Sequence, residues 1–301
     1  MIDPARNRLP NLQKTVVWAT VPRYCREMTD KSPHSTAHSG AHPGERIAKV
    51  ISRSGRASRR EAERLIEEGR VAVNGKTIDS PALNVTSQDR VSVDGALLEP
   101  VSEPRLWLYH KPAGLVTTTR DEKGRKTIYD DLPADLPRVM SIGRLDLNSE
   151  GLLLLTNDGA IKRRLELPST GWLRRYRVRV KGQPDEAKLE PLRKGIEAQG
   201  ERFRPMTVTL DRQTGANAWL TVGLREGKNR EIRRAMTEIG LEVNRLIRVS
   251  YGPFQLGQIK VGDVEEVRRK LLREQLGLTE AASPAKPGGK PRKPAVSRRK
   301  R

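Results

Sequence analysis

The stretch GRLDLNSEGLLLLTNDG, residues 143–159, places one acidic residue, Asp146, between Arg144 and four consecutive leucines. The run Leu152–Leu155 is too short for a helix before the turn residues 157–159, so it predicts a buried strand. Asp146 is therefore predicted to lie in a loop held between two strands, where catalytic groups are often found. Taken alone, an aspartate in a loop is more commonly a turn-capping residue.

Strand patterns continue on both sides of this stretch. They begin at Leu106 (LWLYHK), Val139 (VMSIG), Arg174 (RRYRVRVKG) and Arg245 (RLIRVSYG). In the third pattern, apolar and basic residues alternate with a period of two, which predicts one apolar face and one cationic face. Tyr176 begins the apolar face. It is either an ordinary core tyrosine or a ring at the rim of the core that can stack on a base.

A basic helix is predicted within LREGKNREIRRAMTEIG, residues 224–240. We expect Asn229 to cap the helix and Gly240 to end it. The apolar positions Ile232, Met236 and Ile239 form one stripe. A separate basic face lies at helical spacing, which is typical of either a solvated surface or a functional one. It consists of Arg230, Arg233 and Arg234.

A small module is predicted ahead of these strands. Residues 46–55 form a first helix, and a capping box at Ser58 and Glu61 opens a second helix that ends at Gly69. Asn74-Gly75 is a type I′ hairpin signal. Five arginines lie close together in this module, and they either bind phosphates or form a solvated face balanced by nearby glutamates. They are Arg53, Arg56, Arg59, Arg60 and Arg64.

The net charge of the chain limits the classes of partner that it is expected to bind. The formal net charge is +21, and removing the eight Lys and Arg residues of 283–301 still leaves +13 on the rest. A polyanion, most often nucleic acid, is the expected partner, and an anionic membrane surface is the competing one. No apolar run is long enough to span a bilayer. The single cysteine, Cys25, excludes an internal disulfide and a cysteine-based zinc site, and we predict no metal centre.

The ends of the chain differ in composition from the middle. Residues 1–44 and 277–301 are predicted to be disordered, since both are rich in small, polar or basic residues and in Pro and Gly. Met28 is an alternative start of translation. No secretory signal is recognisable, so a cytoplasmic protein is expected.

The segment ERIAKVISRSGRASRREAERLIEEGRVAVNGKTI, residues 45–78, resembles an S4 RNA-binding domain. We predict this domain over 45–102 and a catalytic domain over 103–276. In the second part, GRLD with its leucine run, RRYRVRV, EGKNREIRR and RLIRVSYG follow one another in order. Together they resemble the ribosomal pseudouridine synthases that carry an N-terminal S4 domain. This resemblance implies an α+β fold with a mixed, mainly antiparallel central sheet and flanking helices.

The same resemblance implies roles for individual residues. Asp146 takes the place of the essential aspartate, Tyr176 that of the stacking tyrosine and Arg233 that of the basic partner of the aspartate. The apolar residue beneath the base is expected to be Leu246, with Ile247 as the alternative. Arg144 resembles the arginine that helps to occupy the vacated base position. Two more residues are candidates for binding the substrate: Lys111 and Arg230.

The implied reaction explains why a lone carboxylate can suffice. Isomerising uridine breaks an N–C bond and forms a C–C bond without exchanging electrons, so no cofactor is expected. Asp146 acts either as a nucleophile or as the base that removes a sugar proton. An adjacent guanidinium keeps it ionised and oriented. The uridine must leave its stack, and one tyrosine beneath the base returns part of that cost.

The target is inferred from one short motif. Glu231 and Arg233 match the large-subunit, type B members of the family, whereas small-subunit members usually carry a His-Gln-Val-Lys form. We therefore expect ribosomal RNA of the large subunit, 23S rRNA in bacteria, or a pre-ribosomal particle as the partner, and a monomeric enzyme. Two alternatives remain open, a small-subunit (16S rRNA) synthase and a non-catalytic rRNA-binding assembly factor.

Overall fold

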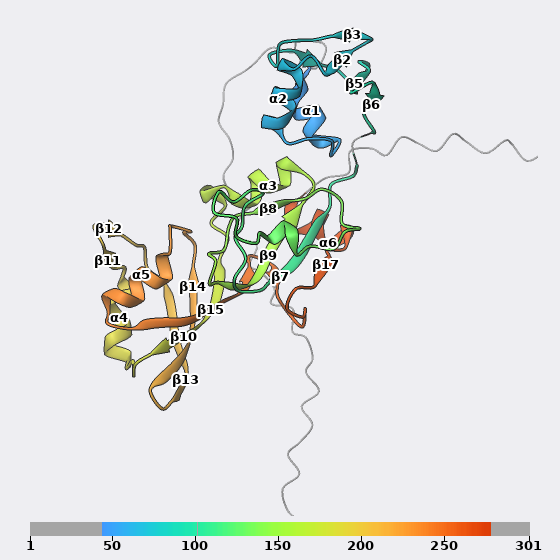
Figure 1. Cartoon of the computed structure of the whole chain (residues 1–301). Coiled ribbons are helices and arrows are strands. Elements are labelled where there is room, and N and C mark those ends of the chain that lie inside the picture. The colour runs from blue at the N-terminus through green and yellow to red at the C-terminus, as the bar shows by residue number, and fades with distance from the viewer. Residues whose placement is uncertain (1–43, 101, 278–301) are drawn as a thin grey trace, which may run out of the picture. The chain divides into compact units, whose positions relative to one another are not determined.

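The computed structural model describes residues 44–100 and 102–277 (Figure 1). The predictions of disorder for 1–44 and 277–301 lie outside the described residues except at Gly44 and Gly277, and so does the alternative start at Met28.

The first part, residues 44–100, contains two helices and short strands around one apolar core. Ser58 accepts a hydrogen bond from Glu61 N, and the Glu61 carboxylate accepts one from Ser58 N, so the predicted capping box is confirmed. Asn74 and Gly75 both have positive φ, which confirms the hairpin turn. The elements are β1 (Glu45–Arg46), α1 (Ile47–Arg53), α2 (Arg59–Glu67), β2 (Val71–Val73), β3 (Lys76–Thr77), β4 (Asn84–Val85), β5 (Val91–Val93) and β6 (Ala96–Leu97).

The second part, residues 102–277, is built on a nine-stranded mixed sheet. Its main path runs in the order β13-β14-β10-β15-β9-β7-β17, with β16 paired to β15 and β8 paired to β9. Every pairing is antiparallel except that of β15 with β9, so the predicted mainly antiparallel sheet is confirmed. The strands are β7 (Leu106–Lys111), β8 (Met140–Ile142), β9 (Glu150–Thr156), β10 (Arg174–Lys181), β13 (Thr207–Thr214), β14 (Asn217–Leu224), β15 (Glu242–Tyr251), β16 (Phe254–Gln255) and β17 (Val264–Glu266).

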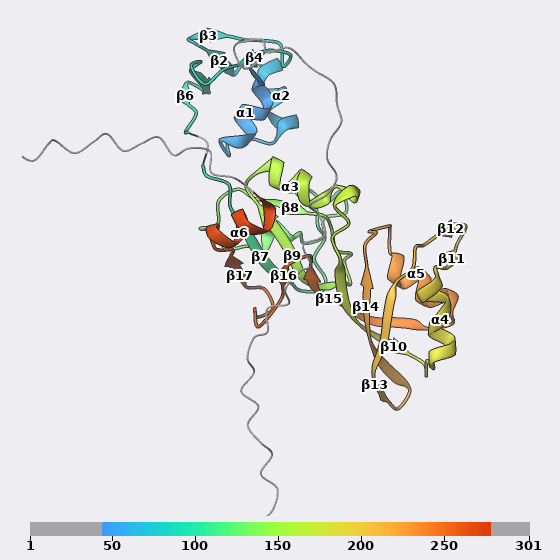
Figure 2. The same cartoon turned by 180° about the vertical axis from the view of Figure 1, so that it is seen from behind.

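Helices cover this sheet in two groups. In Figures 1 and 2, α3 and α6 lie beside β8, β9 and β7, whereas α4 and α5 lie beside β10, β13 and β15. A small hairpin of β11 (Glu197–Ala198) and β12 (Glu201–Arg202) contacts α5. The helices are α3 (Gly159–Glu166), α4 (Glu186–Lys194), α5 (Glu231–Glu238) and α6 (Arg269–Leu276), and short 3₁₀ turns lie at Ile128–Asp130 and Pro168–Thr170. None of the helices in the described residues is long and apolar enough to cross a lipid bilayer.

The leucine run lies in β9, inside the sheet and fully buried, so the predicted buried strand is confirmed. Leu153 and Leu155 face one apolar cluster, and Leu152 and Leu154 face another on the opposite side of β9. A strand that is buried on both faces needs apolar residues at every position rather than at alternate ones. Because this strand is anchored on both faces, it holds the C-terminal end of the loop that contains Asp146 in place.

One glycine allows β9 and β15 to meet directly after that loop. Gly151 pairs with Arg248 in the parallel contact and has φ +99°. A Cβ at this position would lie 2.3 Å from the carbonyl oxygen of Arg248. Only glycine fits both the dihedral angle and the close approach, so this residue helps to set the geometry beneath the loop.

Candidate active site

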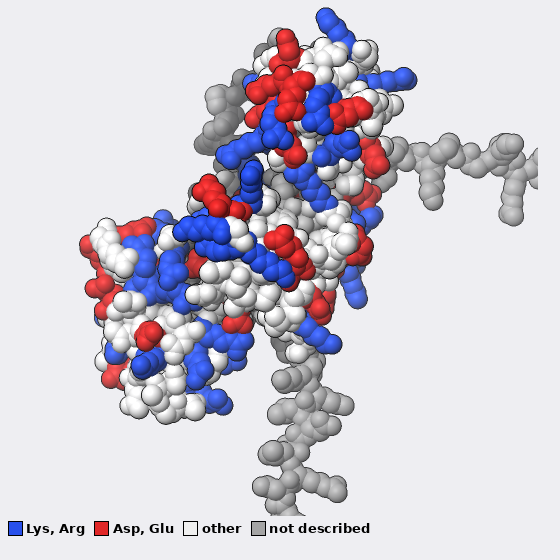
Figure 3. Space-filling model, in the orientation of Figure 1, with Lys and Arg blue, Asp and Glu red and all other residues white. Residues whose placement is uncertain are grey.

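A pocket of about 560 Å³ lies where the loop carrying Asp146 meets strands β10 and β15 and the loop before α5. Figure 3 shows Lys and Arg side chains gathered between the segments that Figure 1 labels β8 and β14. The structure places five of the seven residues predicted for the catalytic domain on the pocket wall. They are Asp146, Tyr176, Arg144, Leu246 and Arg230.

The loop of Asp146 is held by its backbone. Thr117 Oγ1 donates a hydrogen bond to Leu145 O over 2.8 Å, and Gly114 N donates one to Leu147 O, also over 2.8 Å. Ser149 N closes the loop by donating to Asp146 O over 3.0 Å. The carboxylate is left free to face the pocket while the chain around it is fixed, which is the arrangement that a reacting group needs.

Lys111, which was predicted to bind the substrate, lies off the pocket wall and supports this loop from the interior. The side chain is fully buried. Its ammonium donates to Ser149 O over 2.9 Å and to Asp146 O over 3.2 Å, and it also contacts the carbonyls of Pro112 and Leu147. Burial lowers the pKa of Lys111 to about 8, although the negative charge of Asp146 acts in the opposite direction. A buried ammonium that is surrounded by backbone carbonyls positions the loop.

We expect Lys111→Met to lower kcat by tenfold or more and to leave RNA affinity near the wild-type value. The change leaves buried carbonyls unpaired, at about 1 kcal/mol or more each, and loosens the backbone of Asp146. Single-turnover rates at saturating RNA, measured beside filter binding, test this. An unchanged rate with weakened binding would restore the substrate-binding role.

Asp146 forms its ion pair with Arg230. The distance from Arg230 Nη1 to Asp146 Oδ2 is 3.7 Å, and both side chains are partly exposed. Arg233, the partner expected from the resemblance, instead donates to Asn148 O and Val243 O, each over 2.9 Å. Burial and the nearby Arg230 lower the pKa of Arg233, whereas Asp146 raises it. Arg233 therefore acts on Asp146 through the loop and through its field, and Arg230 makes the direct contact.

Tyr176 and Leu246 form the apolar wall of the pocket. They lie on neighbouring strands, β10 and β15, and both point to the inner face of the sheet. Tyr176 is 9% exposed and Leu246 is 6% exposed, so each is packed in the core and still borders the cavity. Ile247, the alternative to Leu246, points to the other face and packs in the other apolar cluster. A flat ring beside an apolar side chain suits a planar base.

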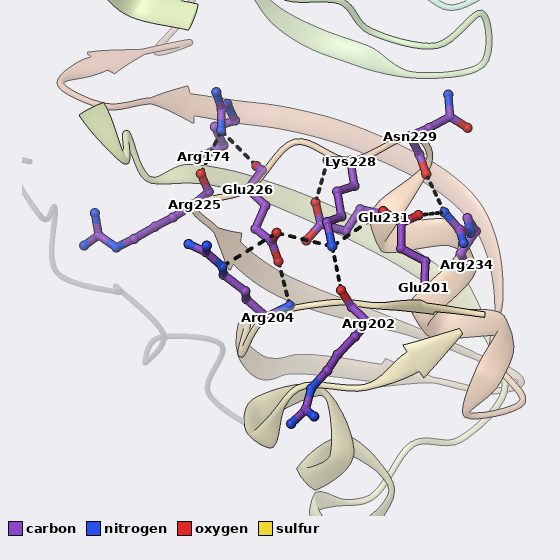
Figure 4. Close-up of polar contacts among 10 residues, drawn as sticks. All are labelled: Arg174, Glu201, Arg202, Arg204, Arg225, Glu226, Lys228, Asn229, Glu231 and Arg234. Carbon is purple, nitrogen blue, oxygen red and sulfur yellow. Dashed lines mark hydrogen bonds and ion pairs between the residues drawn. The ribbon is translucent and has the colours of Figure 1, made fainter. Parts of the chain in front are cut away.

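The loop of residues 225–230 carries Arg230, and a charged network fixes it (Figure 4). Glu226 accepts a hydrogen bond from Arg204 N over 2.6 Å, and Lys228 lies between Glu226 and Glu201 at 3.6 and 3.5 Å. Arg234 also binds Glu201, over 2.6 Å. The predicted basic face of α5 is thus divided between two tasks, because Arg230 and Arg233 face the loop of Asp146 while Arg234 anchors the β11–β12 hairpin.

The capping prediction for Asn229 was wrong. The N-cap of α5 is Arg230, which has φ +49° in the left-handed region and makes no side-chain capping bond. Glu231, the first residue of α5, instead ties the preceding loop to the helix, since its carboxylate accepts a hydrogen bond from Lys228 N over 3.0 Å. The strained backbone of Arg230 turns its side chain toward Asp146 instead of along the helix.

Several pocket residues were not anticipated from the sequence. Arg174 donates to the carbonyls of Arg225 and Glu226, and also to Tyr251 Oη over 2.8 Å, so it clamps the loop of residues 225–230 to the sheet. Arg174 lies two residues before Tyr176 on β10, so the two side chains point to the same face of the sheet. This alternation was the one sequence signal that could have placed Arg174 on the pocket side. The other charged wall residues that were not predicted for the site are Arg248, Lys162, Glu166, Lys228 and Glu231.

Glu231 differs from the other charged wall residues in that its carboxyl group is buried and its pKa is strongly raised. It is 4% exposed, and its Oε1 has no hydrogen-bond partner among the described residues. Burial raises the pKa of Glu231 to about 7, partly offset by its bond from the Lys228 amide. The side chain therefore changes charge close to neutral pH, next to the loop that carries Arg230.

Comparison with known proteins agrees with this geometry. The family model for RNA pseudouridylate synthase matches residues 105–238, and the S4 domain model matches residues 45–91. An RNA pseudouridine synthase of Rickettsia felis is 49% identical over 228 residues, which cover 76% of this chain and 99% of that protein. The chain belongs to the RNA pseudouridine synthases. The resemblance inferred from its motifs and the S4 domain are both confirmed.

This pseudouridine synthase is also similar to a second curated relative and to a solved structure. Ribosomal large subunit pseudouridine synthase B of Yersinia pestis is 41% identical over 219 residues, covering 71% of this chain and 69% of that protein. A solved structure described as a pseudouridylate synthase superposes with a TM-score of 0.56 at 24% identity, covering 77% of this chain and all of that one. The second likeness supports the fold alone.

In the S4 domain of this synthase, three of the five predicted arginines form ion pairs with acidic residues and two do not. Arg53 contacts Glu45 at 2.8 Å, Arg64 contacts Glu68 at 3.4 Å and Arg56 lies 3.8 Å from Asp94. Within residues 44–100, Arg59 and Arg60 form no ion pair with an acid, and both are exposed at the start of α2. These two therefore have the most charge available for phosphates.

Proposed function

We propose that the protein isomerises one specific uridine of large-subunit ribosomal RNA to pseudouridine, with Asp146 as the reacting group. The observation that carries the proposal is the pocket in which a braced carboxylate faces a tyrosine and a leucine wall. Such a pocket accepts one extruded planar base beside one carboxylate.

The atoms of this reaction balance within the nucleotide. The bond between N1 of the uracil and C1′ of the ribose breaks, the base turns, and a bond forms between C5 and C1′. The hydrogen at C5 leaves as a proton, and N1 gains one. Asp146 serves either by attacking the nucleotide or by removing a proton from the sugar.

The surrounding residues supply position and charge. Arg230 lies beside the Asp146 carboxylate, so it orients that carboxylate within the pocket. Tyr176 and Leu246 hold the plane of the base. Arg144 is exposed at the entrance, where it can replace the extruded base in the RNA stack. Lys111 and Arg233 keep the loop of Asp146 in place.

The large subunit is the proposed source of the RNA because two lines agree. Glu231 and Arg233 match the motif expected of large-subunit enzymes, and the relative from Yersinia pestis is named for that subunit. A uridine in a loop is the expected target, since little pairing is broken before it is extruded. Action on rRNA also supports a cytoplasmic location, and the monomeric state stays a prediction.

Purified protein can be offered naked large-subunit and small-subunit rRNA in separate reactions. Carbodiimide modification followed by primer extension then locates any pseudouridine formed. We expect one new stop in the large-subunit RNA. A stop confined to the small-subunit RNA would overturn the choice of subunit and keep the isomerase activity.

Replacing Arg59 and Arg60 with glutamine should weaken RNA binding and leave kcat at saturating RNA unchanged. Each lost phosphate contact on single-stranded RNA flattens the log-log dependence of affinity on salt by roughly 0.7, so the slope should fall by about 1.4. Filter binding over a range of salt concentrations measures the change.

The paired arginines of the same domain provide the control. Arg53→Gln with Arg64→Gln removes the same charge, but each of these side chains is already held by a glutamate. We expect a smaller change in slope for this variant. Equal changes in the two variants would mean that the net charge of the domain, and not the free arginines, governs binding.

A further inference from the structure

The strand that carries Tyr176, β10, has a second side that faces solvent and does not border the pocket. Along β10 the side chains alternate, so that Tyr176, Val178 and Val180 point inward while four basic residues point outward and are exposed. The outward residues are Arg175, Arg177, Arg179 and Lys181. The inner side packs with α4 and α5, and the outward side chains are open to solvent.

The neighbouring strands extend this basic surface. Strand register places Trp219 of β14 beside Arg179, and Arg212 of β13 on the other side of Trp219. Arg245 of β15 lies opposite Arg179. We call this surface the outer face, and it consists of Arg175, Arg177, Arg179, Lys181, Arg212, Trp219 and Arg245.

Cross-strand neighbours leave much of this charge uncompensated. Arg175 and Arg179 lie opposite neutral residues of β14, Gly223 and Trp219. The acids nearby are few: Asp211 lies 3.8 Å from Arg177, Glu150 holds Arg245 at 2.8 Å, and Glu242 is opposite Lys181 in the register. Among the described residues, Arg175, Arg179 and Arg212 form no ion pair with an acid.

Such a row of like charges destabilises a strand. Successive outward side chains are about 6.6 Å apart at their backbones, so the arginines repel one another unless a counter-charge is present. Some arginines elsewhere in the catalytic domain do have such a counter-charge, for example Arg125 with Asp121 and Arg193 with Glu186, at 2.7 and 2.6 Å. Arg175, Arg179 and Arg212 lack it among the described residues, so an external anion would relieve the repulsion between them.

We propose that the outer face binds the phosphates of a second segment of the RNA, distinct from the segment that enters the pocket. This inference rests on the proposal that the substrate is a large rRNA. The charge pattern favours RNA over a protein partner, because this surface offers little exposed apolar area. Its apolar side chains, Trp219 and Ile247, are partly buried, and the Arg177 guanidinium lies over the Trp219 ring, 4.9 Å from the ring centroid. Phosphate contacts of this kind fix orientation and do not read sequence.

The position of the outer face determines which RNA can use it. Tyr176 and Arg177 are successive residues, so the pocket and the outer face lie on opposite sides of β10. A short stem-loop whose uridine fills the pocket does not reach both sides. A long RNA reaches the outer face by passing around β13, the edge strand of the sheet.

The test replaces the three arginines without ion pairs, as Arg175→Gln, Arg179→Gln and Arg212→Gln in one full-length protein. Filter binding and single-turnover rates are measured with two RNAs, the full-length large-subunit rRNA transcript and a minimal stem-loop around the modified uridine. With the transcript we expect at least tenfold weaker binding and a salt slope lower by about 2. With the stem-loop we expect affinity and rate within twofold of the wild type.

Two further variants separate charge from fold. The same three positions changed to lysine keep the charge, and we expect wild-type binding of the transcript. A control with Lys194→Gln, Lys260→Gln and Lys270→Gln removes three exposed charges elsewhere, and we expect a much smaller effect. Unchanged transcript binding in the arginine variant, or an equal loss with both RNAs, would overturn the proposal. A wild-type protein that forms no pseudouridine bears on the proposed function alone, since the outer face is tested by binding.

Discussion

We expect the Asp146→Asn protein to bind RNA as the wild type does and to form pseudouridine at least about 1,000-fold more slowly. The amide keeps the size of the side chain, and its backbone contacts to Lys111 and Ser149 are unaffected. What is lost is the negative charge that either attacks the nucleotide or removes a proton. Tritium release from RNA labelled at C5 of uridine measures the rate, since that hydrogen leaves during the isomerisation.

A matched control separates the role of Asp146 from a general loss of negative charge. Asp135→Asn changes an exposed aspartate that does not line the pocket, and we expect wild-type turnover. Turnover of the Asp146→Asn protein within tenfold of the wild type would show that the carboxylate is a structural residue of its loop.

Arg233→Ala should lower kcat by about 100-fold and change RNA affinity only slightly. The half-buried guanidinium bridges Asn148 O in the loop of Asp146 and Val243 O on β15, so its removal lets the carboxylate shift. Displacement of a reacting group by about 1 Å costs a factor of this size. Rates at saturating RNA, compared with dissociation constants, give the split between the two effects.

Arg230→Ala is the comparison that tests how the two arginines divide their work. Arg230 is half exposed and pairs with Asp146 at 3.7 Å, so we expect a loss in kcat of about tenfold, smaller than for Arg233→Ala. A larger loss for Arg230→Ala would make the direct ion pair, and not the support of the loop, the main requirement. Loss of affinity alone in Arg233→Ala would make that residue a phosphate contact.

The sequence was sufficient for features that depend on periodicity and on turn chemistry. The alternation around Tyr176 predicted a strand with one basic face, and the four leucines predicted a buried strand. Ser58 and Glu61 predicted a capping box, and Asn74-Gly75 predicted a hairpin. In each case neighbours in the chain make the interaction, so local sequence contains the information.

Contacts between distant segments could not be predicted in the same way. The contacts of Lys111 are one example, because nothing in the sequence around Lys111 and Pro112 shows that residues 146–149 close over its ammonium. Asn229 was expected to cap α5, but the left-handed backbone of Arg230 moved the cap by one residue. The choice of Arg230 over Arg233 as the ion-pair partner of Asp146 follows from that same backbone conformation.

The most direct test of the central claim is a map of pseudouridines in rRNA from cells that lack the protein. We predict that one pseudouridine is absent from the large-subunit rRNA of these cells, that the wild-type protein restores it, and that the Asp146→Asn protein does not. A complete set of large-subunit pseudouridines in cells without the protein, or restoration by Asp146→Asn, would contradict the account.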